Sequence, residues 1–577
     1  MKTHIAGPIR LGLVSALALN AGLCVAQAQE STTDEDGAKR LGAITVTAQR
    51  REQNLIDVPL SVTAFDSEQL ELTGAVDITS IQRTTPNATI EVARGSNSTL
   101  VAFIRGVGQQ DPLWGFEPGV GLYVDDVYVA RPQGAILDIF DIDRIEVLRG
   151  PQGTLYGRNT IGGAIKYVTK PLSNEPELKA KMNFGSYGQL DGILSGSTPI
   201  GDTLAIGGAI AKYTRDGYGK NLNTGAEHYN KDVLAYRLSA EGETVTPIDF
   251  DALPQNDFDV PAVYYDDQFS QEFQLLLDSG PWSGVMGVYY LDGNANGAFD
   301  VILGGLGLTV YQAGDQSKEN LSVYGDFTYE LNDQWSVSLG GRYTEDKTTA
   351  DVTRELWLGA GSGSFDPANT SIFFATQTSY NDVSRDDNQF TPRLSVSYKP
   401  TDNLNLYATY SQGFKAGGFD PRAREDLDPT GLSEQGFGPE TVDSYEIGLK
   451  GVFLDGRLTM NSAIFLADYK DQQITVQSGA DSDNNGVNDT FVSSVFNAGE
   501  SQYTGFELEG ALLLTDQLTL SGNLGYIDAE IQEILSGGVN VADQFVTQNT
   551  PELQGQVALN YTNSLGADKG EISLTGS

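Results

Sequence analysis

Few side chains of this chain are suited to covalent chemistry. Its 577 residues include two histidines and one cysteine, against 77 aspartates and glutamates. Cys24 lies in a segment that we expect to be removed, and His228 lies in a polar stretch typical of a loop. The sequence has no glycine-rich phosphate loop and no nucleophile elbow. We therefore exclude disulfides, cysteine-ligated zinc and thiol catalysis in the mature chain, expect no cofactor and do not expect an enzyme.

Side chains suited to the recognition of a small molecule gather in and after the segment Gly106–Gly119. Aromatic and charged groups on a loop framed by glycines suit the binding of a chelate or a sugar. An ordinary exposed loop has the same composition, and this alternative stays open. The candidate ligand-binding residues are Gln109, Asp111, Trp114, Phe116, Glu117, Tyr128 and Arg131.

A candidate metal site has the spacing of the first part of a calcium-binding loop, in which carboxylate and amide oxygens coordinate Ca²⁺. Its residues are Asp481, Asp483, Asn485 and Asp489. Position twelve of the loop is Val492, where an EF-hand has a bidentate glutamate, so an EF-hand is not expected. A surface Ca²⁺ site and a solvated acidic loop are the two alternatives.

A short β-prone segment interrupts the polar residues near the N-terminus. It consists of Ile44, Thr45, Val46, Thr47 and Ala48. A peptide of this kind can pair with the edge of a partner's sheet as an additional strand, and the backbone hydrogen bonds then provide the affinity. Short β-prone segments are common, so the meaning of this one depends on its context.

The elements that must position these candidates begin after a targeting sequence. A basic start is followed by the apolar run Leu11–Val25, which is too short to span a bilayer as a helix, and then by a small-x-small sequence from Ala26 to Ala28. We therefore predict a signal peptide over residues 1–28. Residues 29–54 are expected to form a flexible tail that includes the β-prone segment.

From Leu178 onward, apolar and polar residues alternate in stretches of about ten, each followed by a turn. A period of two places one face of a strand against apolar surroundings and the other against water. Short turns alternate with long polar connections, which is typical of bacterial outer-membrane barrels. We predict a mainly β fold, with a large transmembrane antiparallel β-barrel over residues 173–577. An α/β domain over residues 55–172 precedes it.

Several stretches resemble TonB-dependent outer-membrane receptors. Ile44–Phe65 (ITVTAQRREQNLIDVPLSVTAF) is similar to their energy-coupling box and the start of their plug domain, and Asp141–Pro171 (DIDRIEVLRGPQGTLYGRNTIGGAIKYVTKP) to a later part of the plug. Pro439–Gly451 (PETVDSYEIGLKG) is similar to a barrel strand. The resemblance implies a 22-stranded barrel with the α/β domain as a plug inside its lumen. It also implies that Ile44–Ala48 is the TonB box.

The resemblance further implies a location, partners and a function. The protein would lie in the outer membrane of a Gram-negative bacterium, in contact with outer-membrane lipid, and would bind the periplasmic domain of TonB. Energy from the inner membrane would drive the import of a scarce nutrient, most commonly a ferric siderophore in this family. An oligosaccharide or another organic nutrient is the alternative substrate.

Two other functional classes are weighed against import. A passive porin would lack both the plug and the β-prone segment, and a surface binding protein stays as an alternative. The formal net charge of −41 repels nucleic acid phosphates, so no nucleic acid partner is expected.

Arg149 and Arg158 are candidate latch residues of the plug. Charges confined in a lumen need carboxylate partners, and Glu272, Glu446 and Glu507 in the barrel strands are candidates for this role. A releasable latch and a permanent structural salt bridge are both consistent with this pattern.

The sequence departs from the family pattern at two places. Lys569–Ser577 reads as the start of an alternating strand, whereas complete members end on a strand with a terminal aromatic residue. We therefore expect the barrel to be incomplete at its C-terminal end. The stretch 241–267 shows little alternation, although the count of strand directions requires either an additional strand there or lost sequence.

Overall fold

The computed structural model describes most of the chain between residues 41 and 576. The predicted signal peptide, the first part of the polar tail, the segment 242–261 and the candidate calcium ligands Asp481, Asp483, Asn485 and Asp489 lie outside the described residues. The described residues are 41, 44–72, 75, 77–93, 99–111, 113–133, 135–136, 142–170, 172, 175–200, 204–217, 219–220, 227–228, 230–241, 262–303, 306–427, 431–480, 490–536, 539–564 and 571–576.

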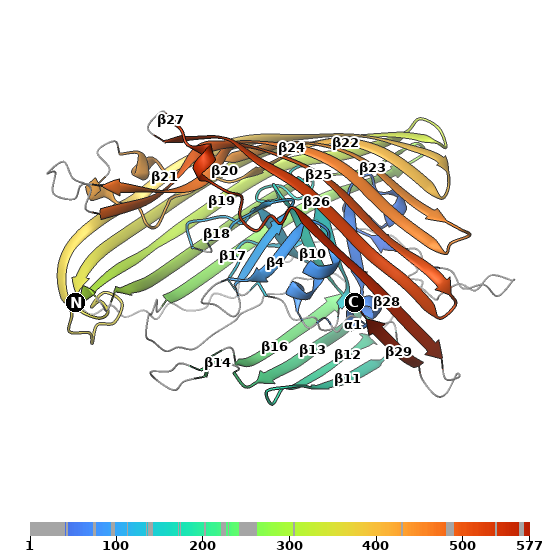
Figure 1. Cartoon of the computed structure of the whole chain (residues 1–577), viewed down its shortest axis with the longest axis horizontal. Coiled ribbons are helices and arrows are strands. Elements are labelled where there is room, and N and C mark those ends of the chain that lie inside the picture. Colours follow the sequence, from blue (N-terminus) through green and yellow to red (C-terminus); the bar gives the residue numbers. More distant parts are fainter. Residues whose placement is uncertain are drawn as a thin grey trace. The chain divides into compact units, whose positions relative to one another are not determined.

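The chain divides into two compact units, and each is described by itself. One unit consists of residues 31–169 and 252–577, and the other of residues 1–30 and 170–251. Figure 1 shows the elements of both units. In the described part of the chain, no helix is long and apolar enough to cross a membrane.

The first unit begins with a small α/β domain. Its main sheet has the strand order β3-β9-β10-β7-β8, in which β10 and β7 are parallel and the other neighbours antiparallel. A second antiparallel sheet has the order β4-β5-β6. The elements are β1 (Thr45–Val46), β2 (Gln53–Asn54), η1 (Leu55–Asp57), β3 (Val62–Asp66), α1 (Ser67–Leu72), η2 (Ile78–Thr84), β4 (Ala88–Val92), β5 (Leu100–Ile104), β6 (Val107–Gly108), β7 (Val120–Val124), β8 (Val127–Val129), β9 (Ile142–Arg149) and β10 (Gly163–Thr169).

The core of this domain forms between the main sheet, the two short helices and the second sheet. Alternate residues of β9, such as Ile145 and Val147, meet Leu70 of α1 and Ile81 of η2 in one buried apolar cluster. The sequence predicts a helical stretch around Ser67–Ile81, and the structure divides it into two helices. The division follows from capping: the Asp66 carboxylate accepts the Gln69 N–H at 2.8 Å, and the Asp77 carboxylate starts a new helix by accepting the Thr79 N–H at 3.0 Å.

A large antiparallel sheet forms the rest of the first unit. Its strands follow one another in chain order, and β27 pairs beside β26. Strands β18 to β21 contain 22 to 30 residues, more than the roughly ten that cross the hydrocarbon core of a bilayer. The strands are β17 (Ala262–Ser279), β18 (Trp282–Leu303), β19 (Leu308–Glu330), β20 (Trp335–Leu358), β21 (Ile372–Thr401), β22 (Leu404–Lys415), β23 (Glu440–Phe453), β24 (Leu458–Ala480), β25 (Thr490–Thr515), β26 (Leu518–Ser536), β27 (Val539–Asn540), β28 (Leu553–Ser564) and β29 (Glu571–Gly576).

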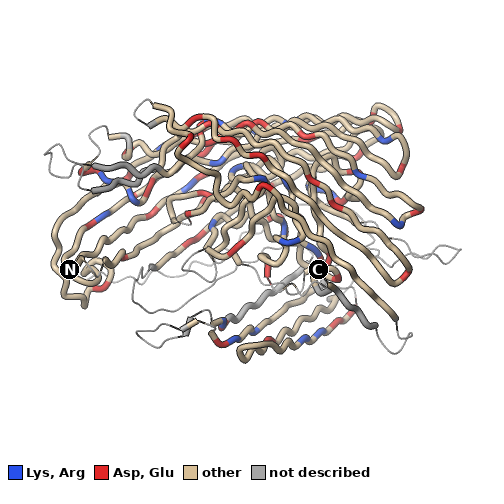
Figure 2. Tube along the Cα trace, in the orientation of Figure 1, with Lys and Arg blue, Asp and Glu red and all other residues tan. Residues whose placement is uncertain are grey.

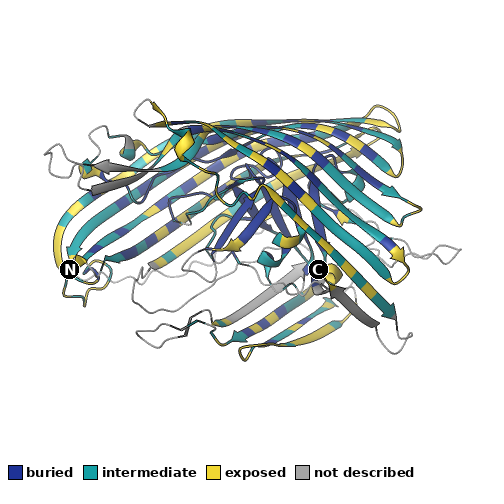
Figure 3. Cartoon of the chain, viewed as in Figure 1, coloured by how far each residue is buried: buried dark blue, intermediate teal, exposed yellow. Residues whose placement is uncertain are grey.

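Side chains of the large sheet are arranged with apolar residues outward and polar residues inward. In β19, Leu321 and Val323 are 46% and 56% exposed, while the intervening Ser322 is 1% exposed. Strand β20 repeats the pattern with exposed Leu339 and buried Ser338. Figure 3 shows the alternation along the strands. This order is the reverse of a water-soluble sheet and suits a sheet that faces lipid on one side.

The α/β domain lies against the concave side of the large sheet (Figure 1). Hydrogen bonds join the two, for example from the Ser61 N–H to Glu446 at 3.0 Å and from the Thr154 hydroxyl to the Thr391 carbonyl at 2.9 Å. Figure 2 shows positive and negative residues gathered where the two meet. Apolar contacts also join them, for example where Val107 and Ile161 of the domain meet Phe465 of β24.

The second unit contains a four-stranded antiparallel sheet with the order β11-β12-β13-β16. Leu178, Met182 and Phe184 on one face of β11 are exposed, as on the outer face of the large sheet. Its elements are β11 (Glu177–Phe184), β12 (Leu190–Ile200), β13 (Leu204–Arg215), β14 (Gly219–Lys220), β15 (Glu227–His228) and β16 (Lys231–Glu241). The first segments predicted as barrel strands thus form antiparallel strands, and one face of β11 carries exposed apolar side chains.

Candidate functional site

The candidate TonB box (Ile44–Ala48) is folded against the α/β domain. β1 pairs antiparallel with β2, with Thr45 opposite Asn54. The side chains of Val46 and Ala48 are completely buried in an apolar cluster of the domain. The sequence predicts a flexible tail over residues 29–54, whereas in the structure apolar burial and strand pairing hold the part from residue 44 onward.

Polar side chains also hold the backbone of the candidate TonB box. The Thr47 N–H donates to Glu146 Oε1 at 2.8 Å, and the Lys166 ammonium donates to the Thr47 carbonyl at 3.1 Å. The Tyr156 hydroxyl donates to the Ala48 carbonyl at 3.0 Å. These contacts use backbone groups that pairing with a partner's strand would need. The box can pair along its full length only after they open.

Arg50 connects the residues after the box to the large sheet. Its guanidinium lies 3.1 Å from Asp126, 3.6 Å from Glu272 of β17 and 4.5 Å from the centre of the Tyr156 ring. Burial by itself raises the pKa of Asp126, but the attraction of Lys166 and Arg50 outweighs it and holds that pKa below its ordinary value. The ionised carboxylate thus keeps two cations beside the box.

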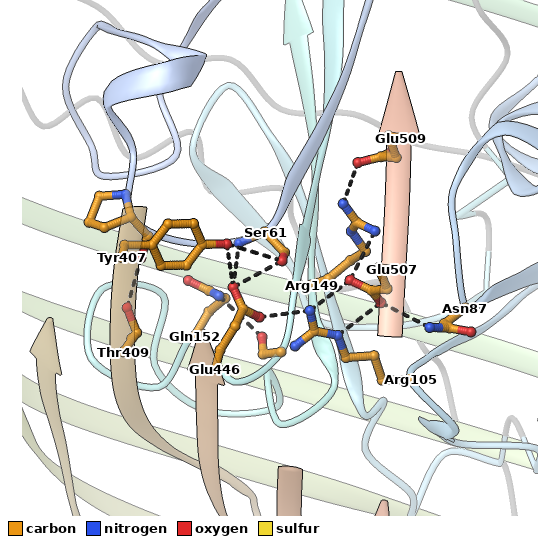
Figure 4. Close-up of polar contacts among 12 residues, drawn as sticks. Ser61, Asn87, Arg105, Arg149, Gln152, Tyr407, Thr409, Glu446, Glu507 and Glu509 are labelled. Atoms are coloured by element: carbon orange, nitrogen blue, oxygen red, sulfur yellow. Dashed lines mark hydrogen bonds and ion pairs between the residues drawn. The ribbon is translucent and has the colours of Figure 1, made fainter. Parts of the chain in front are cut away.

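Two arginines of the α/β domain face three glutamates of β23 and β25 (Figure 4). Arg105 lies 2.7 Å from both Glu446 and Glu507. Arg149 lies 3.0 Å from Glu507 and also pairs with Glu509. Burial by itself lowers the pKa of Arg105, but Glu507 and Glu446 outweigh it and raise that pKa above its ordinary value. The candidate latch residue Arg149 is thus one member of a five-residue charge cluster.

Neutral donors complete the charge cluster. The Tyr407 hydroxyl donates to Glu446 at 2.7 Å, and the Asn87 amide donates to Glu507 at 3.1 Å. The Ser61 hydroxyl donates to Glu446 at 2.9 Å (Figure 4). Every one of these polar groups can exchange its partner for water if the domain and the sheet separate. The apolar contact of Arg105 with the Phe465 ring, 4.0 Å from its centre, would be exposed at the same time.

The other candidate latch residue, Arg158, belongs to a different cluster. It lies 2.6 Å from Asp346 of β20 and 3.1 Å from Glu117. Lys318 of β19 also pairs with Glu117. The Asn159 amide donates a hydrogen bond to the Glu117 carboxylate at 2.6 Å. Glu117, which the sequence suggests as a ligand-binding residue, is therefore a buried carboxylate shared between the α/β domain and the large sheet.

The structure does not bring the seven candidate ligand-binding residues to one surface. Besides Glu117, two others are buried in internal contacts. Tyr128 accepts a hydrogen bond from the Asn159 amide at 3.1 Å. The Trp114 ring packs directly on the backbone of Gly297 in β18. A Cβ atom on Gly297 would come within 2.5 Å of the ring. Only a residue without a side chain leaves room for the indole there.

The other four candidates line one pocket of the α/β domain. They are Gln109, Asp111, Phe116 and Arg131, and the remaining walls are mostly apolar. Apolar walls with a few convergent polar groups are typical of small-molecule sites. The enclosed space of about 20 Å³ has room for about one water molecule, so a larger ligand would have to widen the pocket. The seven candidates are thus divided between this pocket and the contacts of the domain with the large sheet.

Described residues of the connection 416–439, which joins β22 to β23, reach the same pocket residues. Within it lie η4 (Glu425–Leu427) and α2 (Leu432–Gln435). Arg422 lies 3.0 Å from Asp111 and 4.9 Å from the centre of the Phe116 ring, and the Phe437 ring lies 5.9 Å from that of Phe116. A ligand at the pocket would therefore contact both the α/β domain and this connection.

In the described residues, no group of three or more His, Cys, Asp or Glu side chains could hold a metal ion. The candidate calcium ligands lie outside these residues, so a calcium site there stays a prediction.

Comparison with known protein families matches the two parts of the chain separately. Residues 151–575 match the family described as TonB dependent receptor-like, beta-barrel, and residues 54–164 match the TonB-dependent Receptor Plug Domain. The chain belongs to the TonB-dependent receptor family. The α/β domain is accordingly the plug, and the sheets are those of the β-barrel of an outer-membrane receptor.

Similar proteins are known from other bacteria. The receptor is 24% identical over 570 residues to the pesticin receptor of Yersinia pestis, covering 84% of this chain and 76% of the relative. Among solved structures, it is similar to the ferric yersiniabactin uptake receptor FyuA from Yersinia pestis, with a TM-score of 0.69, 20% identity and coverage of 89% of this chain and 85% of that one. The ferric-catecholate import receptor Fiu from E. coli K12 has a TM-score of 0.59, 14% identity and coverage of 88% and 85%. These structures share the fold of the receptor.

Several residues of these clusters were not predicted from the sequence. Arg105, Arg50 and Lys318 lie in β-prone or polar stretches, and nothing in their spacing indicates a partner. Glu507 is one of the candidate partners named from the sequence, and it pairs with Arg149. Glu509 carried a usable signal as well, because residues two apart in a strand share a face. Acids on the inward face of a barrel strand are natural partners for plug arginines.

Proposed function

We propose that this receptor imports a ferric siderophore across the outer membrane, with energy supplied through TonB. Family membership supports a TonB-dependent receptor that recognises a ligand. The names of the relatives, among them receptors for ferric yersiniabactin and ferric catecholates, favour an iron chelate as that ligand.

The observation that carries the transport mechanism is how the candidate TonB box is held. Its β-prone residues pair with β2 and are fixed by Glu146, Lys166 and Tyr156 through hydrogen bonds. Polar contacts of this kind open at a modest cost in free energy, since water replaces each partner. Once open, the box offers a strand for pairing with the periplasmic domain of TonB.

The pocket lined by Gln109, Asp111, Phe116 and Arg131 is the proposed ligand site. An aromatic ring, an amide and charged groups of both signs suit a chelate that presents aromatic rings and polar oxygens. Binding there would contact the plug directly, so a bound ligand would alter the element that must move for import.

Uptake of radioactive iron tests the proposal. Iron-starved cells carrying the chromosomal gene would receive iron on a hydroxamate, a catecholate and a mixed-ligand siderophore. The Val46→Pro variant removes a backbone N–H from the box, so energised uptake should be lost while binding to chilled cells persists. Val46→Ile is the matched control and should keep both.

The outcomes separate the alternatives. Uptake that depends on the gene and is lost in Val46→Pro supports import of that siderophore class. Equal uptake by wild-type, variant and deletion strains for all three siderophores would overturn the iron proposal. Growth on sugars or other organic nutrients that depends on the gene would then identify the substrate class.

A further inference from the structure

Tyr156 fixes the candidate TonB box at one end of a row of three tyrosines. Its hydroxyl donates to the Ala48 carbonyl at 3.0 Å and to the Thr47 carbonyl at 3.4 Å. The side chain is buried, and its ring packs in the same apolar cluster as Val46. A displacement of Tyr156 therefore changes the contacts of the box directly.

Tyr123 connects Tyr156 with Tyr128. The Tyr123 and Tyr156 rings meet edge to face, with centroids 5.0 Å apart, and the Tyr123 and Tyr128 centroids are 5.4 Å apart. The Tyr123 hydroxyl also donates to the Tyr156 carbonyl at 2.9 Å. All three side chains are at most 5% exposed. Close-packed rings cannot move independently, so a shift of one ring displaces the next.

Asn159 lies at the other end of the row. Its amide nitrogen donates to the Tyr128 hydroxyl at 3.1 Å and to Glu117 at 2.6 Å, and its amide oxygen accepts the Ala416 N–H at 3.0 Å. Asn159 is completely buried and has a φ of 60°, a conformation that few residues other than glycine adopt. One side chain thus contacts the loop of the ligand pocket, the end of β22 and the row of tyrosines.

We propose that Tyr128, Tyr123 and Tyr156 form a relay that couples the contacts of Asn159 to the attachment of the candidate TonB box. This inference rests on the proposed function and assigns the regulation of the box to named residues. A change at Glu117 or at the connection after β22 alters the hydrogen bonds of Asn159. The row of rings carries that change to the hydroxyl that holds the box.

The hydroxyl groups distinguish the relay from an ordinary apolar core. Phenylalanine would fill the same volume, yet each tyrosine hydroxyl makes a contact along one direction of the row. Tyr128 accepts from Asn159, Tyr123 donates to the Tyr156 carbonyl, and Tyr156 donates to the backbone of the box. Removing a single hydroxyl therefore breaks one link while the packing remains.

A spin label on the exposed Thr45 measures release of the box. The label is attached to Thr45→Cys in a Cys24→Ser background, since Cys24 is the only cysteine of the chain. The full chain is purified in detergent, and the mobile fraction of the label is read from its spectrum. Tyr156→Phe should raise that fraction roughly fivefold, because one or two hydrogen bonds to the box are lost.

The remote variants are the decisive measurement. Tyr128→Phe, Tyr123→Phe and Asn159→Ala should each raise the mobile fraction roughly two- to threefold, although none of these residues has a hydrogen bond to the box in the structure. Tyr469→Phe is the matched control, since Tyr469 is an equally buried tyrosine outside the row. It should leave the spectrum unchanged.

A double variant distinguishes a relay from separate local effects. If Tyr123 couples Asn159 to the box, then in a Tyr123→Leu background the Asn159→Ala change should not raise the mobile fraction of the label any further. Independent, multiplying effects of the two changes would overturn the relay, as would a normal spectrum for Asn159→Ala beside an altered one for Tyr156→Phe. Near-ultraviolet circular dichroism identifies variants that are misfolded.

Binding of the purified periplasmic domain of TonB separates this inference from the proposed function. The label reads release of the box without TonB and without a ligand. If the variants release the box but bind no TonB domain, the proposed function fails and the relay stands. If TonB binds the wild-type receptor but the remote variants leave the label unchanged, the relay fails alone.

Discussion

At the scale of single residues, buried charges of the receptor find partners far away in the sequence. Glu507 of the barrel receives hydrogen bonds from Arg105 and Asn87 and lies 3.0 Å from Arg149. An ion in such a place is tolerated only while its partners remain, because the loss of one leaves uncompensated charge in the interior. Each member of the cluster is therefore sensitive to replacement.

Glu507→Ala should lower the stability of the plug domain. It leaves Arg105 and Arg149 with fewer carboxylates, so the free energy of unfolding of the plug should fall by about 3 kcal/mol. Denaturant unfolding in detergent, followed by hydrogen exchange of β5 and β9, measures the change. Glu500→Ala, an exposed acid on the same strand, is the control. Equal losses in both variants would contradict the role of the cluster.

Asp126 makes the attachment of the box depend on pH. Its pKa is held below the ordinary value, so its contribution is fully present above about pH 4 and is lost as the pH falls through the depressed value. The mobile fraction of the Thr45 label should therefore rise only at acidic pH. Glu272 also lies near Arg50, and Glu146 pairs with Arg144 beside the box, so Asp126→Asn isolates the effect of Asp126. A wild-type profile in that variant would refute the prediction.

At the scale of elements, the alternation of a barrel strand decides which side faces lipid. In β19, outward Val323 lies seven residues from the strand end at Glu330, near the middle of a span of about ten residues. Outward Leu306, in the turn before the strand, lies far beyond that span and is 73% exposed. The exposed side chain of Val323 is therefore expected to contact lipid, whereas that of Leu306 is expected to contact water.

Val323→Arg should destabilise the barrel by about 2–4 kcal/mol, because it places a charge near the middle of the bilayer. Leu306→Arg should change the stability by less than about 1 kcal/mol, since its side chain stays in water. Folding into lipid vesicles across a denaturant series measures both. A similar cost for the two variants would mean that the band of lipid contact is misplaced on β19.

At the scale of the whole molecule, the plug carries the candidate TonB box at one place and the proposed ligand pocket at another, and charge clusters join it to the barrel. Under the proposed function, work supplied at the box can act only if the box first leaves the plug. A covalent bond between β1 and β2 should therefore stop import without affecting the fold.

Cysteines at the paired positions Thr45 and Asn54 test this requirement. Opposite residues of antiparallel strands lie within the range that a disulfide spans. Oxidised cells should lose energised uptake and regain it after reduction. The pair Val263→Cys and Ala298→Cys joins β17 to β18 within the barrel wall and should have no effect. Uptake by the oxidised Thr45–Asn54 receptor would show that the box need not detach.

Much of the fold could be predicted from local patterns. Alternation in segments such as Leu321–Asp326 depends only on neighbouring residues, and it indicates an outward and an inward face of the strand. The sequence also predicts an α/β domain over residues 55–172, with a helical stretch around Ser67–Ile81. The family was predicted from motifs that are themselves local stretches of sequence.

The pairing of the candidate site residues is different, because it depends on contacts between distant segments. Arg105 and Glu507 are 402 positions apart, and Thr47 and Lys166 are 119 apart. Such pairs form only when strand register and the position of the plug bring them together. The sequence by itself therefore determined the strands, their two faces and the excess of acid. The tertiary structure decided which glutamates meet which arginines, that Glu117 is an interior carboxylate, and that the candidate TonB box is held rather than free.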